Sequence, residues 1–225
     1  MSRQRDMMLR EMGLAPVWRL RARASSEPQP ALDNIAPNIA EMDWQTLAHT
    51  VAECRACGLC EQRRQAVFGV GDPAARWLLV GEGPGAEEDA RGEPFVGPAG
   101  KLLDAILAAL GLSRGKDVYI ANAVKCRPPN NRTPEPAEID ACRPYLERQI
   151  ALIAPRIIVA LGRPAAQALL KRELAIKDAR GQVFDVAGIP LIVTYHPAYL
   201  LRNPADKAHV WEDLRRARST LLARG

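Results

Sequence analysis

The sequence predicts an α/β fold, a three-layer α/β/α sandwich with a mostly parallel central sheet. First, apolar segments with the length of buried strands occur at 77–80, 118–122, 156–161 and 189–194. Second, helical patterns follow them at about 99–110, 135–153, 164–171 and 205–222. Third, 225 residues with 48% hydrophobic content suffice for one domain with a sizeable core. Strands that alternate with helices are typical of a parallel sheet covered on both faces.

The predicted domain covers residues 44–225 and begins with a helix. Asp43 can cap this helix, and Leu47 and Val51 are spaced to share one of its faces. The strand at 77–80 ends in the glycine-rich turn Gly81-Glu-Gly-Pro-Gly85. This turn marks where the chain leaves the sheet.

Glycine and proline define the later boundaries. Gly111 stops the helix at 99–110, and the Pro-rich loop 127–134 precedes the helix at 135–153. Gly162 ends the strand at 156–161, and a further strand is expected near 181–184. With these boundaries, strands and helices alternate along the whole predicted domain.

Residues 1–43 are expected to form an N-terminal extension and linker that is partly flexible. A short amphipathic helix is expected within 1–24, and residues 25–40 are rich in Pro, Ser and Asn. The extension is a candidate docking segment for a repair or replication partner.

Net charge and the absence of targeting signals limit the classes of protein to which this sequence can belong. Lys and Arg number 31 against 26 Asp and Glu, a net charge of +5 that permits a polyanionic partner without identifying one. No run of 18 apolar residues exists, so no membrane span is expected. The first thirty residues lack a signal-peptide core. We expect a monomer in a bacterial-type cytoplasm, associated with the nucleoid when acting.

Five cysteines form an odd count, which fits a disulfide scaffold poorly. Cys54-x-x-Cys57-x-x-Cys60 contains chelating pairs, and Cys126 and Cys142 can complete a set of four thiolates. Zinc and an iron–sulfur cluster both fit this spacing. Cys60 can replace Cys54, and the two downstream cysteines can instead be small buried apolar residues.

Chemically distinctive residues follow the predicted parallel strands. In such sheets, ligands bind beyond the carboxyl ends of the strands. Those ends carry Glu82-Gly83, Asn122, Gly162 and His196. Their convergence predicts an active site.

The glycine-rich turn differs from a phosphate-binding loop. It lacks the GK[ST] signature, and three acids at 87–89 would repel phosphate. These acids also suit the first turn of a helix. Phe95 lies in the following loop, where it can be a core residue or a stacking platform for a planar base.

Two basic segments follow strands. Lys125, Arg127 and Arg132 in loop 122–132 form either a phosphate-contacting wall or a solvated loop. The segment His196-Pro-Ala-Tyr-Leu-Leu201 precedes Arg202, a further candidate for DNA contact. Leu200 and Leu201 are candidate wedges for a base stack, with helix packing as the competing role.

Four motifs together resemble the family 4 uracil-DNA glycosylases, the iron–sulfur branch of that superfamily. They are Gly81-Glu-Gly-Pro-Gly85 with Glu88-Asp89, Gly92-x-Pro-Phe-Val-Gly97-x-Ala-Gly100-x-Leu-Leu103, Asn122-x-x-Lys-Cys-Arg-Pro-Pro129 and His196-Pro-Ala-x-Leu-Leu201. The cysteine pattern matches as well, and the resemblance covers about residues 44–222.

The resemblance implies a uracil-DNA glycosylase-like fold and a structural four-iron–four-sulfur cluster. Its ligands would be Cys54, Cys57, Cys126 and Cys142, which leaves Cys60 outside the set. It also implies a monofunctional DNA glycosylase of base excision repair. Such an enzyme flips uracil out of single- or double-stranded DNA, hydrolyses its N-glycosidic bond and leaves an abasic site.

The resemblance further implies roles for the residues at the strand ends. His196 would hydrogen-bond uracil O2, with backbone amides near Gly83, and Asn122 would read the O4 and N3–H edge. Phe95 would stack on the ring, and Glu88 would exclude the thymine methyl. Other branches place an Asp where this chain has Gly83, so the nearest carboxylate, Glu82, is the candidate for orienting water or stabilising the sugar cation. The alternative is catalysis that rests mostly on stabilising the leaving base, with no strong general base.

Two other functions compete with glycosylase activity. A protein of the same fold could bind and trap uracil-DNA without turnover, although no Arg- and Lys-rich insert stands beside His196. A zinc-stabilised adaptor would not use the cleft at all.

Overall fold

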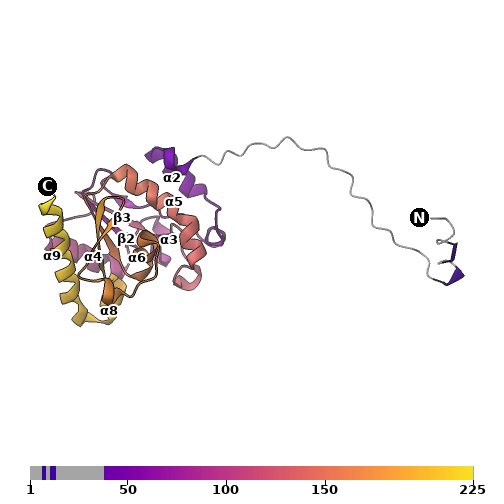
Figure 1. Ribbon diagram of the computed structural model, residues 1–225. Coiled ribbons are helices and arrows are strands. Elements are labelled where there is room, and N and C mark those ends of the chain that lie inside the picture. Colours follow the sequence, from indigo (N-terminus) through magenta and orange to yellow (C-terminus); the bar gives the residue numbers. More distant parts are fainter. Residues whose placement is uncertain (1–6, 9–10, 14–37, 225) are drawn as a thin grey trace. The chain divides into compact units, whose positions relative to one another are not determined.

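The computed structural model of the chain describes residues 7–8, 11–13 and 38–224 (Figure 1). The chain divides into two units, Met1–Ala36 and Pro37–Gly225. Residues 7, 8 and 11 of the first unit are helical. The rest of the helix expected within 1–24, and most of the linker expected at 25–40, lie outside the described residues. The second unit carries the fold.

A six-stranded sheet lies at the centre of this unit. In the order β1-β3-β2-β4-β6-β5, the four inner strands are parallel and the two edge strands are antiparallel to their neighbours. The strands are β1 (Val70–Gly71), β2 (Trp77–Gly81), β3 (Val118–Asn122), β4 (Ile157–Leu161), β5 (Val183–Val186) and β6 (Ile189–Thr194). The predicted, mostly parallel sheet is confirmed.

Helices cover both faces of the sheet, as Figure 1 shows for α9 on one side and α5 on the other. One face carries α4 (Pro98–Ala109), α8 (Pro197–Arg202) and α9 (Lys207–Ala223). The other carries α5 (Pro136–Ile153), α6 (Arg163–Leu170) and α7 (Ile176–Ala179), with α2 (Trp44–Glu53) packed on α5. Short helices complete the chain: α3 (Ala86–Arg91), η1 (Ile39–Glu41), η2 (Gly58–Glu61), η3 (Pro129–Asn131) and η4 (Pro204–Asp206).

The two faces of β2 show how the sequence builds two cores. Trp77 and Leu79 point into the cluster beneath α4 and α9, whereas Leu78 and Val80 point into the cluster beneath α5 and α6. All four are at most 3% exposed, so this strand reads as a continuous apolar run. Burying each such side chain contributes roughly 1.5–3 kcal/mol.

The packed body begins earlier than the predicted boundary at residue 44. Met42 is 5% exposed, and its carbonyl oxygen accepts a hydrogen bond of 2.6 Å from Arg148 Nε on α5. Asp43 caps α2 as expected, its carboxylate accepting from Thr46 N at 2.8 Å. Residues 39–42 therefore belong with the domain rather than with a linker.

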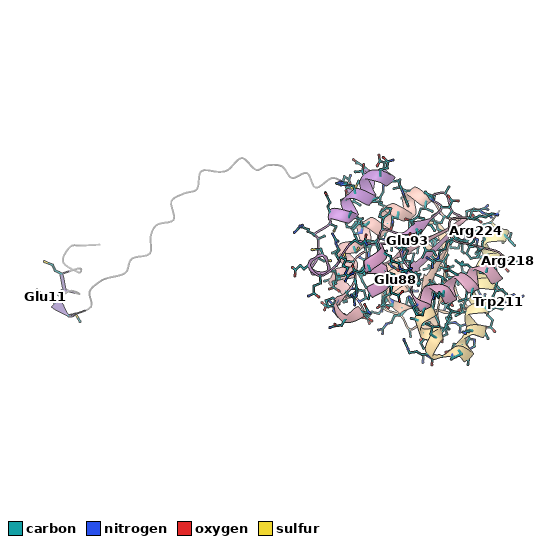
Figure 2. All side chains as sticks on the ribbon, turned by 180° about the vertical axis from the view of Figure 1, so that it is seen from behind. Glu11, Glu88, Glu93, Trp211, Arg218 and Arg224 are labelled. Atoms are coloured by element: carbon teal, nitrogen blue, oxygen red, sulfur yellow. The ribbon has the colours of Figure 1, made fainter. Side chains whose placement is uncertain are left out.

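The outer face of α9 is polar apart from a few apolar side chains. Figure 2 shows Trp211 and Arg218 on this helix and Arg224 just beyond its end, and Trp211 is 40% exposed. No helix in the described part of the chain is long and apolar enough to span a bilayer.

Candidate active site and cysteine centre

The carboxyl ends of the parallel strands open onto one pocket of about 550 Å³. Its walls come from the loops that follow β2, β3, β4 and β6. Six residues predicted at the site line this pocket: Glu82, Gly83, Glu88, Phe95, Asn122 and His196. The sheet thus gathers residues that are up to 114 positions apart in the sequence.

Asn122, the last residue of β3, places an unsatisfied acceptor in the pocket. Its side chain is 2% exposed, and Asn122 Oδ1 is the one buried side-chain oxygen or nitrogen without a hydrogen-bond partner among the described residues. A buried acceptor in this state costs about 1–3 kcal/mol. A ligand N–H that reaches Asn122 Oδ1 would recover that free energy.

His196, directly before α8, has one ring nitrogen already engaged. The Ala198 backbone N–H donates to His196 Nδ1 at 3.1 Å. Burial, followed by the Arg202 guanidinium, lowers the pKa of the imidazole to about 4. The neutral ring with Nδ1 as acceptor carries its proton on Nε2, so this nitrogen is the donor available to a ligand.

Phe95 is held against His196 in an uncommon backbone conformation. The two rings stack with centroids 5.4 Å apart, and Phe95 has φ 56°. Arg114 donates to the carbonyl oxygen of Phe95 at 2.5 Å. A Cβ at residue 100 would lie 1.7 Å from that oxygen, so the α4 backbone can approach only because residue 100 is glycine.

Glu88 on α3 ties the Phe95 loop to the glycine-rich turn. Its carboxylate accepts from the backbone N–H groups of Val96 at 2.9 Å, Gly97 at 3.2 Å and Gly85 at 3.1 Å. Glu88 thus shapes the pocket wall. Its predicted exclusion of the thymine methyl stays a prediction.

Glu82 follows β2 and brings a second carboxyl to the pocket. Burial raises the pKa of Glu82, and Thr133 and Arg163 partly oppose this change. The group therefore retains a proton to a higher pH than an exposed glutamate does.

The five cysteines line one small pocket between α2, η2 and α5. Three sulfur atoms accept N–H donors: Arg63 Nη1 donates to Cys126 Sγ at 2.8 Å, Lys125 N to Cys142 Sγ at 3.3 Å, and Ala56 N to Cys54 Sγ at 3.5 Å. No group of three or more His, Cys, Asp or Glu residues among the described ones is arranged to hold a single metal ion.

The cysteine pocket has the chemistry of a thiolate-ligated group. Burial raises the pKa of Cys57 and Cys126, and raises that of Cys142 to about 12. Closely spaced thiolates repel one another, so a bound cation would be needed to hold them deprotonated. Sulfur donors with surrounding N–H groups fit an iron–sulfur cluster.

Two predicted DNA contacts are wrong. Lys125 is 1% exposed, and its ammonium donates inside the protein to the Asn122 carbonyl oxygen at 2.9 Å and to Gln149 Oε1 at 2.5 Å. Leu200 is 0% exposed and packs in the core. The neighbouring Leu201, at 47% exposure, is the leucine that faces solvent.

Of the remaining predicted DNA contacts, two lie at the pocket and one does not line it. Arg132 and Arg202 line it, whereas Arg127 donates to Asn131 Oδ1 at 2.7 Å. Arg132 also pairs with Glu138 at 2.6 Å. Their contact with DNA stays a prediction.

Sequence reasoning missed three contributors to these two sites. Arg163 and Tyr195 line the pocket, and each stands next to a strand-end residue that was singled out, Gly162 and His196. Proximity to those residues could have identified them. Arg63, which bonds Cys126, belongs to no pattern that would have revealed it.

Comparison with known proteins identifies the family of this chain. The family model of the uracil DNA glycosylase superfamily matches residues 68–215. A type-4 uracil-DNA glycosylase of Pyrobaculum aerophilum is 46% identical over 181 residues, covering 77% of this chain and 92% of the relative. One of Thermotoga maritima is 44% identical, covering 80% and 96%. A type-5 uracil-DNA glycosylase of Thermus thermophilus is 37% identical, covering 69% and 87%. The chain therefore belongs to the uracil-DNA glycosylase superfamily and, within it, to the type-4 uracil-DNA glycosylases, a family of enzymes.

Proposed function

We propose that this chain is a monofunctional DNA glycosylase. It extrudes uracil from single- or double-stranded DNA and hydrolyses the bond between N1 and C1′, which releases free uracil and leaves an abasic site. The observation that carries the proposal is the buried, unsatisfied Asn122 Oδ1 in the pocket that also holds His196.

Asn122 would select uracil by its hydrogen-bonding edge. Asn122 Oδ1 accepts from uracil N3–H, and the amide Nδ2 donates to uracil O4. Cytosine offers an acceptor at N3 and a donor at its amino group, so both contacts would be lost. A site that leaves buried polar groups without partners rejects the wrong ligand by about 10⁴–10⁵-fold in favourable cases.

His196 would stabilise the leaving base. As the bond to C1′ breaks, negative charge develops on uracil O2, and His196 Nε2–H donates to that oxygen. The backbone N–H of Gly83, on the pocket wall, is a second donor for the same oxygen. A positioned donor of this kind contributes about 10²–10³-fold to the rate.

Three further side chains would complete the reaction site. Glu82 orients water toward C1′ or stabilises the developing sugar cation, Phe95 offers its ring to the base, and Glu88 shapes the wall near uracil C5. Arg132 and Arg202, which line the pocket, and Arg127 contact DNA phosphates.

The cysteine pocket would hold a four-iron–four-sulfur cluster on Cys54, Cys57, Cys126 and Cys142. Support comes from the thiols that share one pocket and from the N–H groups that surround them. When bound, the cluster links distant segments of the chain rather than taking part in cleavage. Cys60 remains outside the ligand set, and iron and zinc analysis of the purified protein separates the two metals.

Uracil release from a uracil-containing oligonucleotide tests the function. The iron-loaded wild type should release free uracil, and Asn122→Asp should be strongly impaired because a carboxylate cannot donate to uracil O4. Gln62→Ala, an exposed change near the cysteines, serves as the control. Wild-type protein that releases no uracil contradicts the proposal, and a covalent protein–DNA species on a denaturing gel supports trapping instead.

A further inference from the structure

Arg63 joins three parts of the chain through one guanidinium group. Its Nη1 donates to Cys126 Sγ at 2.8 Å. Its Nη2 donates to the backbone oxygens of Ala52 at 2.7 Å and Cys54 at 2.9 Å. Arg63 therefore connects the end of α2 and the first cysteine loop to a cysteine 63 positions away.

The carbonyl contacts explain why an arginine suits this position. Ala52 lies in the last turn of α2, and Cys54 is its C-cap, where backbone oxygens lack helical partners. A cation at a helix C-terminus is favourable. The planar guanidinium can donate in two directions at once, which the ammonium of lysine cannot do in fixed geometry.

The sulfur contact has a different consequence. Arginine stays protonated, so its N–H donates a charge-assisted hydrogen bond to Cys126 Sγ. Donation to a ligating sulfur withdraws electron density from it and favours the reduced state of a cluster. Residues that hold ligands in this way typically change metal affinity by about 10–100-fold when mutated.

We propose that Arg63 is a positioning residue of the cysteine centre. It holds Cys126 and the Cys54 loop in the arrangement that binds the cluster, and it raises the reduction potential of that cluster. This inference rests on the proposed cluster.

The segment that carries Arg63 also supports the uracil pocket. The backbone N–H of Arg64 donates to Asp89 Oδ1 at 2.9 Å, and Asp89 on α3 is 2% exposed. The preceding residue of α3 is Glu88, which holds the loop of Phe95. Displacement of the Arg63 segment would therefore reach a wall of the pocket.

Two variants and a matched control test the role of Arg63 in the full-length, anaerobically iron-loaded protein. Arg63→Gln removes the charge and the forked donor, whereas Arg63→Lys keeps the charge. Arg64→Gln is the control, because this exposed neighbour is bonded to Asp89 through its backbone alone. The measurements are iron per chain, bleaching of the cluster absorbance by an iron chelator, and reduction potential by voltammetry.

Arg63→Gln should lose its cluster to the chelator about 10–100-fold faster than wild type. Its potential should shift to a more negative value. Arg63→Lys should bleach at an intermediate rate, and it also supplies the comparison if Arg63→Gln does not fold. Arg64→Gln should match wild type in all three measurements.

Two outcomes overturn the inference in distinguishable ways. If wild type binds a cluster but the Arg63 variants match it in bleaching rate and potential, Arg63 has no positioning role and the proposed cofactor stands. If iron-loaded wild type shows no cluster absorbance, the proposed cofactor fails and the inference fails with it. Uracil release by the same wild-type preparation is scored separately.

Discussion

The pocket at the carboxyl ends of the strands and the cysteine centre are built in opposite ways. In the pocket, parallel strands deliver polar groups whose positions the sheet already fixes, and Asn122 Oδ1 has no hydrogen-bond partner among the residues that the structure describes. In the cysteine centre, the sulfurs come from segments outside the sheet and are held by side-chain and backbone donors. The pocket therefore offers an unmet acceptor to a ligand, whereas the cysteine centre offers sulfur atoms that N–H donors already hold.

The two regions nevertheless share one short segment. Asn122 and Cys126 are four residues apart, and Lys125 between them contacts both regions. Its ammonium bonds the Asn122 carbonyl oxygen at 2.9 Å, and its backbone N–H bonds Cys142 Sγ at 3.3 Å. Variants that affect one region without the other measure how independent they are.

Among these variants, His196→Ala should show the largest difference between its effect on the pocket and its effect on the cysteine centre. Loss of the donor to uracil O2 should lower the single-turnover rate of uracil release by about 10²–10³-fold. Iron content should remain that of wild type, because His196 does not line the cysteine pocket. A variant that loses iron in proportion to activity would show that the regions are not separable.

A cysteine substitution should have the reverse pattern. Cys142→Ala should lose most of its iron and unfold at a lower temperature, since binding free energy of a structural metal group is folding free energy. Cys60→Ser is the matched control and should keep both iron and stability. Iron analysis and thermal unfolding test this prediction. Equal loss of iron and of thermal stability in Cys142→Ala and Cys60→Ser would refute the proposed ligand set.

Lys125→Met should affect both regions. The change leaves Gln149 Oε1 and the Asn122 carbonyl oxygen without their buried donor, which should lower the free energy of unfolding by about 1.5–3 kcal/mol. Urea unfolding measures this loss. An unchanged free energy of unfolding would mean that the buried ammonium stabilises the fold no more than an apolar side chain does.

The pH dependence of stability should report His196. Its folded-state pKa of about 4 lies below the unfolded value of 6.5, so the unfolded state binds the proton first. This contribution to stability is complete above pH 6.5 and is lost as the pH falls toward 4. Urea unfolding of wild type and His196→Gln across that range should show a shallower acid loss in the variant; parallel curves would argue against the depressed pKa.

The smallest effect is expected for Arg202→Gln in the pocket lining. Removing one phosphate contact should reduce the salt slope of DNA binding by about 0.9, with little sequence dependence. Fluorescence anisotropy at several salt concentrations measures the slope. An unchanged slope would remove Arg202 from the DNA contacts.

The sequence allowed prediction of five strands, the long helices and six pocket residues, but not of the two-residue edge strand β1. Apolar runs such as Ile157–Leu161 identify buried strands, and the carboxyl ends of parallel strands locate the site. The short helices α3 and α8 have six residues each, too few for a periodic pattern. The orientation of Leu200 and Leu201 in α8 therefore depended on tertiary packing.

Lys125 illustrates a second limit of sequence reasoning. A lysine in a loop with two arginines has the composition of a solvated basic surface. Its burial depends on Gln149, which lies on α5 and 24 residues away. The residues near Lys125 in the sequence do not reveal a single partner that lies this far along the chain.

Asn122 Oδ1, which has no hydrogen-bond partner in the described part of the chain, has a consequence for improving heat resistance. An apolar residue of similar size at position 122 would remove a buried acceptor and should stabilise the fold, while it would also remove the proposed contact with uracil. Selection for thermal tolerance alone would therefore favour inactive variants at this position. Useful stabilising changes have to come from surfaces away from the strand ends, such as the outer face of α9.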